Sequence, residues 1–184
     1  MELRAKAPFY HGNSFAFWLL TDTKKYNSAN GLAEIDIVEI LGRKNSIEST
    51  VHKYNPVTGE HFSFWPAGVN RAYTFESDQN TLSTEWHTYG LEWDTEKLKY
   101  YVDGNKYLEI GITENDDISP TAKNTTMKMF HDPMYIIISE YLYSPARTSL
   151  GNARLTGDEP EVNYTLEVDY VALYQRTGEK LYTY

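Results

Sequence analysis

The sequence contains no cysteine, no apolar run long enough to cross a membrane, and no excess of basic residues. The absence of cysteine excludes disulfide bonds, thiolate metal sites and a cysteine nucleophile, although it leaves the cellular compartment open. The net charge is −9, and a surface of that sign repels nucleic acids and anionic membranes. Neither nucleic-acid binding nor membrane insertion is therefore expected.

The length and the aromatic content point to one β-rich domain. A chain of 184 residues fits a single domain, residues 1–184, with a substantial core. Tyrosine occurs 16 times and tryptophan 4 times, and such side chains suit both a sandwich core and stacking against sugar rings. The sequence shows no internal repeats, glycine-rich phosphate loops or basic stripes.

The most informative stretch has the sequence EIDIVE and runs from Glu34 to Glu39. Valine and isoleucine favour strands, and the two-residue period of a strand places Glu34 and Asp36 on one face and the isoleucines between them on the other. Glu39 is out of phase with this alternation. A β-bulge at Ile37 or Val38 would return Glu39 to the acidic face.

Three carboxylates on one face suggest acid and base chemistry on a glycosidic bond. A retaining glycosidase uses two carboxyl groups about 5–5.5 Å apart, one as nucleophile and one as acid/base. The crowded negative charge would keep one of the acids protonated near neutral pH, as a proton donor requires. A calcium site or a solvated acidic strand is the alternative, but the tight alternation with isoleucine and valine favours the catalytic interpretation.

The acidic stretch resembles the E-x-D-x-x-E signature of glycoside hydrolase family 16, in the bulged form associated with laminarinases, agarases and carrageenases. Other motifs of the family follow in the right order between about Arg4 and about Gln175. They are FAFWLL (15–20), STVH (49–52), WHTYGLEW (86–93), YVDG (101–104) and VDYV (168–171). The order of the motifs makes the resemblance more specific than the six acidic-stretch letters alone.

This resemblance implies a fold and roles for the acids. The expected fold is an all-β, concanavalin A-like β-sandwich (jelly roll) of two curved antiparallel sheets, with the acids facing a groove open at both ends. Glu34 would be the nucleophile, Asp36 its hydrogen-bonding assistant, and Glu39 the general acid/base.

The same resemblance implies a substrate class. The expected activity is endo-acting, retaining hydrolysis of a polysaccharide, first of all a laminarin-type β-1,3-glucan. A β-galactan hydrolase of the agarase, carrageenase or porphyranase type and a non-catalytic carbohydrate-binding sandwich are the alternatives.

Three residues outside the acidic stretch are candidates for contact with the substrate. His52 lies in a predicted strand, residues 47–54, that would pair with the acidic strand and bring the imidazole beside the carboxylates. A histidine merely hydrogen-bonded on a sheet face is an equal alternative. Trp65 lies in a predicted long loop, residues 54–69, where it would stack on a sugar or anchor the loop. Trp18 precedes the acidic strand and is the third candidate.

No cofactor and no metal ion are required by the proposed chemistry. In the family, the counterpart of Asp169 often helps to hold a structural calcium ion on the convex face. The N-terminal partners of that calcium site have no counterpart here, so calcium at Asp169 is only an alternative.

Between two alternating runs, Asp103-Gly104 predicts a tight hairpin, with a type I′ turn.

The family also suggests where the protein acts and how much of the fold this sequence holds. Family members are usually exported, which implies a secreted, periplasmic or cell-surface location, although residues 1–6 do not form a signal peptide.

Members of the family typically have several strands of sequence before the equivalent of Arg4. A divergent minimal member, a fragment, and a domain of a longer protein are all consistent with this difference. A fragment would have exposed sheet edges.

Overall fold

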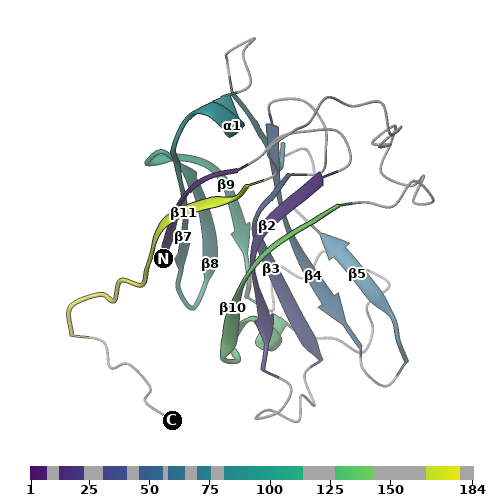
Figure 1. Ribbon diagram of the computed structural model, residues 1–184. Helices are drawn as coiled ribbons and strands as arrows, with labels where there is room; N and C mark the ends of the chain where they lie inside the picture. Colours follow the sequence, from purple (N-terminus) through teal and green to yellow (C-terminus); the bar gives the residue numbers. More distant parts are fainter. Residues whose placement is uncertain are drawn as a thin grey trace.

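The computed structural model describes residues 1–7, 13–22, 31–40, 46–55, 58–64, 70–75, 81–113, 127–142 and 165–178. These residues form two antiparallel sheets that pack face to face, as Figure 1 shows. The predicted all-β sandwich is therefore confirmed. Among the described residues, no helix is long and apolar enough to cross a membrane.

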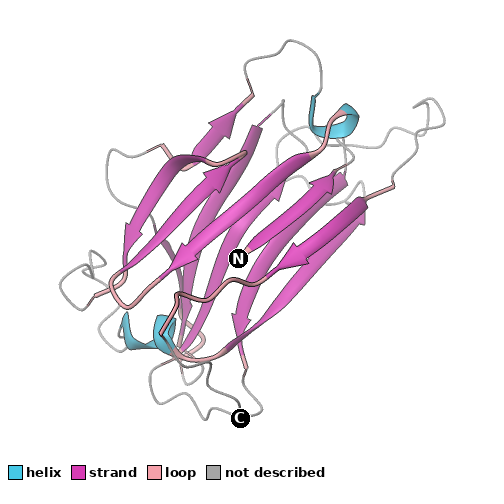
Figure 2. Cartoon of the chain, turned by 90° about the vertical axis from the view of Figure 1, so that its left-hand side faces the viewer, coloured by secondary structure: helices cyan, strands magenta, loops and turns pink. Residues whose placement is uncertain are grey.

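The first sheet has five strands in the order β11-β1-β7-β8-β9. Its strands are β1 (Glu2–Lys6), β7 (His87–Trp93), β8 (Lys97–Val102), β9 (Asn105–Gly111) and β11 (Glu167–Ala172). In Figure 2 this sheet is turned toward the viewer. The strands nearest in sequence, β7, β8 and β9, form a meander, whereas β1 and β11 come from opposite ends of the chain.

The second sheet has six strands. Five of them lie in the order β10-β2-β3-β4-β5, and the sixth, β6, also pairs with β4. Its strands are β2 (Asn13–Thr21), β3 (Leu32–Ile40), β4 (Ser46–Tyr54), β5 (His61–Phe64), β6 (Ala72–Thr74) and β10 (Met134–Leu142). Two short helical segments, α1 (Thr81–Thr84) and η2 (Met127–His131), complete the described elements. The acidic stretch lies in β3, in the interior of this sheet.

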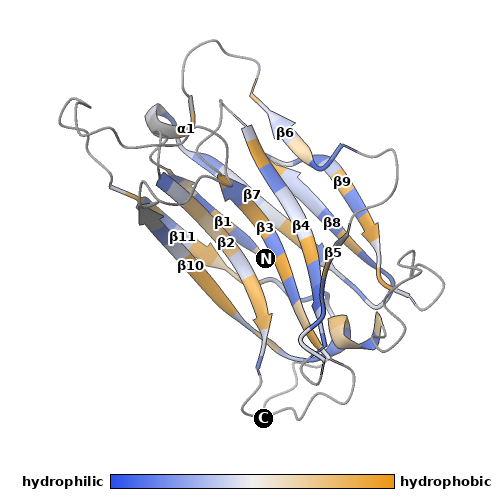
Figure 3. Cartoon of the chain, turned by 90° about the vertical axis from the view of Figure 1, so that its right-hand side faces the viewer, coloured by the Kyte–Doolittle hydropathy of each residue, from blue (hydrophilic) through white to orange (hydrophobic). Residues whose placement is uncertain are grey.

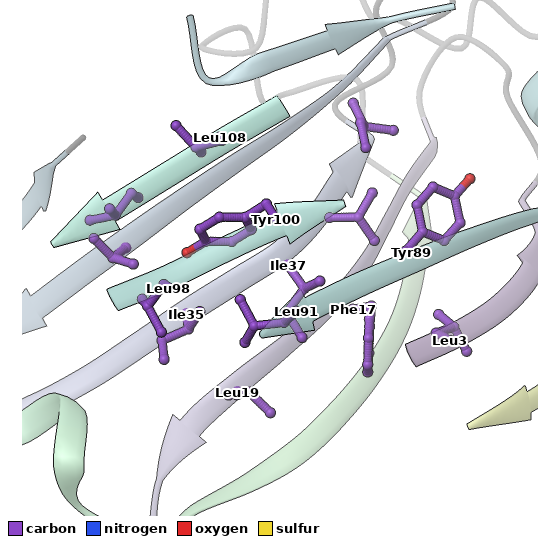
Figure 4. Close-up of a cluster of buried hydrophobic side chains, with 14 of the residues drawn as sticks. Leu3, Phe17, Leu19, Ile35, Ile37, Tyr89, Leu91, Leu98, Tyr100 and Leu108 are labelled. Atoms are coloured by element: carbon purple, nitrogen blue, oxygen red, sulfur yellow. The ribbon is translucent and has the colours of Figure 1, made fainter. Parts of the chain in front are cut away.

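The core fills the space between the sheets because alternate residues of each strand point inward. Figure 4 shows side chains from both layers meeting there. The second sheet contributes Phe17, Leu19, Ile35 and Ile37, and the first contributes Leu3, Tyr89, Leu91, Leu98, Tyr100 and Leu108. Since the inward side of β3 is fixed by this core, its acids have to face the other way.

The hairpin between β8 and β9 has the predicted turn. Asp103 and Gly104 have φ angles of 49° and 78°, and two successive positive φ values define a type I′ turn. The Asp103 carboxylate accepts hydrogen bonds from His87 Nδ1 and from the backbone N–H of Thr88, each over 2.8 Å. These contacts tie the turn to the neighbouring strand β7.

Two expectations about secondary structure were wrong. The predicted loop of residues 54–69 contains β5, which pairs with β4 over four residues. The alternation of residues 164–175 in the sequence predicts one long strand that closes the sandwich, but among the described residues of this run only β11, which covers six residues, is a strand. A bulge at Asp169 breaks its alternation, because Arg4 pairs with Tyr170 and Ala5 pairs with Val168.

The edges β10 and β11 expose apolar side chains. Figure 3 shows β10 as mostly hydrophobic along its length. Val171 lies opposite Leu3 and Ile136 lies opposite Leu19. The two partners are buried in the core, whereas Val171 is 42% exposed and Ile136 is 40% exposed. The inward sides of both edge strands are therefore only partly covered.

Candidate active site

A β-bulge in β3 sets the direction of its acids. Across β4, Asp36 pairs with Thr50 and Glu39 pairs with Glu48. Two residues of β3 thus stand opposite the single residue Ser49, which is the definition of a bulge. The Ser49 hydroxyl donates to the carbonyl oxygen of Ile37 over 2.6 Å and so satisfies a backbone acceptor displaced by the bulge. The predicted bulge is confirmed at the predicted place.

The bulge places all three acids on the outward side of the second sheet, a surface called here the acid face. Glu34 and Glu39 are half-buried, whereas Asp36 is only 3% exposed. The intervening and following isoleucines are buried in the core; they are Ile35, Ile37 and Ile40. One strand therefore supplies the core with its apolar residues and the acid face with its carboxylates, and Figure 3 shows hydrophilic and hydrophobic positions following one another along β3.

His52 reaches the acids from β4, as its predicted pairing required. It lies directly opposite Glu34 in the register of the two strands. Its Nε2 atom is 2.8 Å from Asp36 Oδ2 and 3.7 Å from Glu34 Oε1. The imidazole therefore contacts two of the three carboxylates.

The other predicted contact residues have different outcomes. Trp18 pairs in register with Asp36 across β2 and β3, and its indole N–H donates to Ser139 Oγ over 3.1 Å. Trp18 is half-buried, and its position opposite Asp36 places it on the acid face. Trp65 lies outside the described residues. Asp169 forms an ion pair with Arg4 in the five-stranded sheet, where a guanidinium group would compete with a cation.

Two further residues on the acid face were not predicted. The Tyr54 hydroxyl donates to Glu34 Oε2 over 3.2 Å. Arg71 donates to Thr50 Oγ1, and its Nη2 atom lies 2.6 Å from Glu48 Oε2. Arg71 thus brings a positive charge to the Glu39 end of the row. The two-residue period of a strand could have predicted that Tyr54, two residues after His52, shares its face. The presence of Arg71 on the acid face could not be predicted in this way, because it depends on the pairing of β6 with β4.

The surroundings of the three carboxyl groups favour their protonated forms. Burial raises the pKa of Asp36 to about 7, against a smaller opposing effect of Arg71. Burial and then the charge of Asp36 raise the pKa of Glu39 to about 8. Burial and then Asp36 also raise the pKa of Glu34, while His52 and the Tyr54 hydroxyl act to lower it. Both glutamates thus have raised pKa values, but only Glu34 has a phenol donor that acts against the shift.

The acid face could also coordinate a cation. One ligand atom each from Glu34, Asp36 and His52 lies within 4.8 Å of the others. His52 Nε2 lies 2.8 Å from Asp36 Oδ2, although this carboxylate oxygen is buried without a hydrogen-bond partner among the described residues. Because acidic groups of this kind are common without an ion, we assign no metal ion.

Comparison with known proteins agrees with this geometry. The family described as "Glycosyl hydrolases family 16" matches residues 1–156. The chain is 29% identical to "Glucan endo-1,3-beta-glucosidase A1" of Niallia circulans, over 95% of this chain and 24% of that protein. It is also 29% identical to "Beta-glucanase" of Rhodothermus marinus, over 95% of this chain and 56% of that protein.

A solved structure gives the same result at the level of the fold. The endo-β-1,3-glucanase of Pyrococcus furiosus superimposes with a TM-score of 0.57 at 30% sequence identity, over 77% of this chain and 49% of that chain. The chain spans between 24% and 56% of the length of these relatives. The family match itself covers most of the present sequence. The chain belongs to glycosyl hydrolases family 16.

Proposed function

We propose that this chain is an endo-acting, retaining glycoside hydrolase that cleaves internal linkages of a β-1,3-glucan. The observation that supports this proposal most directly is the bulge in β3, because it brings Glu34, Asp36 and Glu39 to one partly exposed face. The names of the relatives from Niallia circulans and Pyrococcus furiosus favour a β-1,3-linked glucan as the substrate.

In the proposed reaction, Glu34 attacks the anomeric carbon while Glu39 protonates the departing glycosidic oxygen. Glu39 then removes a proton from water, which attacks the glycosyl-enzyme and releases the product with retained configuration. The raised pKa of Glu39, about 8, supplies the proton near neutral pH. Asp36 lies between the two glutamates and orients Glu34.

Two neighbours keep Glu34 able to act as a nucleophile. The Tyr54 hydroxyl donates to one of its oxygens, and His52 Nε2 lies 3.7 Å from the other. Hydrogen bonding to the ionised form of a carboxylate stabilises that form. These contacts act against the burial and the nearby Asp36 charge, although the pKa of Glu34 is still raised on balance.

Substitution of each glutamate by glutamine tests the two roles. Glu34→Gln should lower turnover by several orders of magnitude without changing the fold, since the amide matches the carboxylate in shape. Glu39→Gln should impair substrates with poor leaving groups most, because its role is to protonate the leaving oxygen. Glu92→Gln is the matched control, because Glu92 lies in the other sheet and pairs with Lys99.

Product analysis distinguishes the roles further. Proton NMR of the first product should show the β anomer, as retention requires. Azide should rescue Glu34→Ala to give a glycosyl azide of inverted configuration, and Glu39→Ala to give one of retained configuration. Near-normal hydrolysis by Glu34→Gln would rule out the assignment.

A substrate panel separates the proposed activity from its alternatives. Release of reducing ends from laminarin, but not from agarose or carrageenan, is the expected result. Release from a galactan instead would redirect the substrate assignment to that polymer. Saturable binding to a glucan without release would identify a carbohydrate-binding domain and overturn the catalytic proposal.

We further propose that the protein works outside the cytoplasmic membrane. Its proposed substrate is a polymer too large to enter a cell intact, so cleavage has to precede uptake. Fractionation of the native host, followed by detection with an antibody against this chain, tests the proposal. Detection in the cytoplasm alone would contradict it.

A further inference from the structure

Two bulges, one in each sheet, are linked across the core by one hydroxyl group. In β3 the extra residue is Ile37, since the residues on either side of it pair with consecutive residues of β2. In β9 the extra residue is Tyr107, because its two neighbours pair with consecutive residues of β8. The Ser49 hydroxyl of β4 contacts both the carbonyl oxygen of Ile37 and the hydroxyl of Tyr107. The first sheet therefore reaches the bulge of the acidic strand through Ser49.

We propose that Tyr107 and Ser49 are positioning residues, which stabilise the bulge in β3 and thereby keep Glu39 on the acid face. This inference rests on the proposed function, because it concerns the residue that would protonate the leaving oxygen. Ser49 is fully buried and shares its side of β4 with the core residues Ile47 and Val51. Both positioning residues thus act from the core side, through the backbone of β3.

The chemistry of the three groups fixes the direction of the two hydrogen bonds. A carbonyl oxygen can only accept, so the single hydroxyl proton of Ser49 is donated to Ile37, over 2.6 Å. The Tyr107 hydroxyl then has to donate to Ser49 Oγ. Burial raises the pKa of the Tyr107 phenol, so this donor keeps its proton throughout the neutral range.

The hydroxyl is the donor that Ser49 can offer to the bulge. Its backbone N–H donates to the carbonyl oxygen of Arg71, on the opposite side of β4, over 3.0 Å. Without the hydroxyl, the Ile37 carbonyl would lose this donor inside the core, which is unfavourable for a buried backbone acceptor. The Tyr107 ring is itself held by contacts with the rings of Tyr73 and Tyr100, at centroid distances of 5.4 and 6.5 Å.

The position of Glu39 depends on the bulge because a strand alternates its side chains. In a strand without a bulge, residues an odd number of positions apart lie on opposite faces. Glu39, five residues after Glu34, would then point into the core, and Ile40 would point outward. A less stable bulge therefore affects the Glu39 end of the row first.

Charged and titratable groups surround Glu39 on the acid face. They are Asp36 and Glu34 of β3, His52 and Glu48 of β4, and Arg71 beside β6, whereas its partner on β2 is the uncharged Ala16. Burial, and then the charge of Asp36, raise the pKa of Glu39 to about 8. If the bulge loosens, the carboxyl group gains water and moves away from Asp36. Its pKa should then fall by roughly 0.5–1 unit, a fraction of the 3–5 units that full burial produces.

Carbon-13 NMR of the Glu39 carboxyl group, titrated in the full chain, tests the inference without any substrate. Tyr107→Phe removes only the hydroxyl and should lower the pKa of Glu39. Ser49→Ala should lower it at least as much. Adding Tyr107→Phe to Ser49→Ala should have no further effect, because the phenol acts only through Ser49.

Tyr100→Phe is the matched control. Tyr100 is a buried tyrosine of the same sheet and points into the same core (Figure 4), but its hydroxyl has no hydrogen-bond partner among the described residues. Its removal should leave the titration of Glu39 as it is in the parent protein.

The pH profile of laminarin hydrolysis is the second measurement. In Tyr107→Phe the basic limb of kcat/KM, which reports the proton of Glu39, should move to lower pH, while the acidic limb stays in place. Turnover of substrates with poor leaving groups should fall roughly tenfold, less than the 10²–10⁴-fold that a general acid contributes. A general loss of stability would lower the unfolding midpoint without moving one limb alone.

An unchanged pKa of Glu39 in Tyr107→Phe, or an equal fall in Tyr100→Phe, would overturn the inference. Additive effects of the two substitutions would also overturn it, since Tyr107 would then act by another route. If Ser49→Ala does not fold, Tyr107→Phe and its control decide the question. The expected fall in a chain that hydrolyses no polysaccharide would instead refute the proposed function and leave the positioning intact.

Discussion

Tyr54 on β4 donates a hydrogen bond to Glu34 Oε2 on β3 over 3.2 Å. Burial, and then the charge of Glu34, raise the pKa of the Tyr54 phenol, so it remains a donor throughout the neutral range. A permanent donor beside a carboxylate favours its ionised form. Tyr54 therefore supports the ionised state that the proposed role of Glu34 requires.

The first prediction concerns this phenol. Tyr54→Phe should lower kcat/KM roughly tenfold to a hundredfold, since a hydrogen bond to a charged group contributes about 1.5–3 kcal/mol. It should also move the acidic limb of the pH profile upward, because the Tyr54 contact lowers the pKa of Glu34. Tyr101→Phe in the other sheet is the control. A Tyr54→Phe profile that coincides with the parent profile would contradict this role.

The second prediction is that the protein is more stable at pH 5 than at pH 8. The pKa of Asp36 is raised from 3.8 to about 7 and that of Glu39 from 4.5 to about 8. Between these limits the folded chain binds more protons than the unfolded chain, so stability falls as pH rises. His52 opposes the effect because burial lowers its pKa.

Urea unfolding at several pH values measures this dependence. Glu39→Gln should reduce the decline between pH 5 and pH 8, because one of the responsible protons is removed. Glu92→Gln should leave the slope as it is in the parent protein. An equally steep slope in Glu39→Gln would show that Glu39 is not protonated in the folded state.

The third prediction concerns Tyr135, which lies on the acid face two strands away from Glu34. The register runs from Tyr135 to Leu20 and from Leu20 to Glu34, a separation of about 10 Å at the usual strand spacing. Tyr135 is 44% exposed, so its ring is available to stack on a sugar bound beyond the cleavage point.

Tyr135→Ala should therefore raise KM for long glucans about twofold to tenfold, as loss of an aromatic contact of about 0.5–1.5 kcal/mol predicts. The kcat value should change little, and Tyr135→Phe should behave like the parent protein. Kinetics on laminarin and on short oligosaccharides provide the comparison. Equal effects on long and short substrates would argue against a distant sugar site.

The fourth prediction tests the hairpin between β8 and β9. Gly104 has a φ of +78°, and the space that a Cβ atom would occupy is open, so only the backbone conformation opposes a side chain. Gly104→Ala should destabilise the fold by about 1–2 kcal/mol, measured by urea unfolding. Gly104→Asn should cost less, because asparagine tolerates this conformation. Hydrolysis should be unaffected at a temperature where both variants are folded.

The fifth prediction follows from the exposed edge strands. Val168 and Val171 are each 42% exposed, although they pair with the buried residues Ala5 and Leu3. Uncovered apolar edges favour association with other chains. Light scattering should therefore show association that grows with concentration, and Val171→Lys should reduce it. A chain that stays monomeric at all concentrations would contradict the prediction.

The alternation of residue types along the sequence was sufficient to predict the centre of the site. The alternation of acids and isoleucines between Glu34 and Glu39 predicted both the strand and its bulge, because side-chain direction depends only on the adjacent backbone. The same holds for the turn at Asp103 and for the approach of His52, which required only that two successive strands pair.

The surroundings of the site depended on contacts between distant parts of the chain. His61 and Ser63, which contact His52, lie in a stretch whose turn residues suggested a loop, and only pairing with β4 makes it a strand. Tyr135 reaches the acid face through β10, roughly a hundred residues after the acids. The exposed state of β11 likewise depends on which elements cover it.

The sequence alone determined which residues of β3 face the core and which face outward, since a two-residue period is a local property of the backbone. Only the tertiary structure decided which side chains surround the carboxylates and how far their proton affinities are shifted. Strand order and burial result from packing across the whole sandwich, and no short stretch of sequence contains that information.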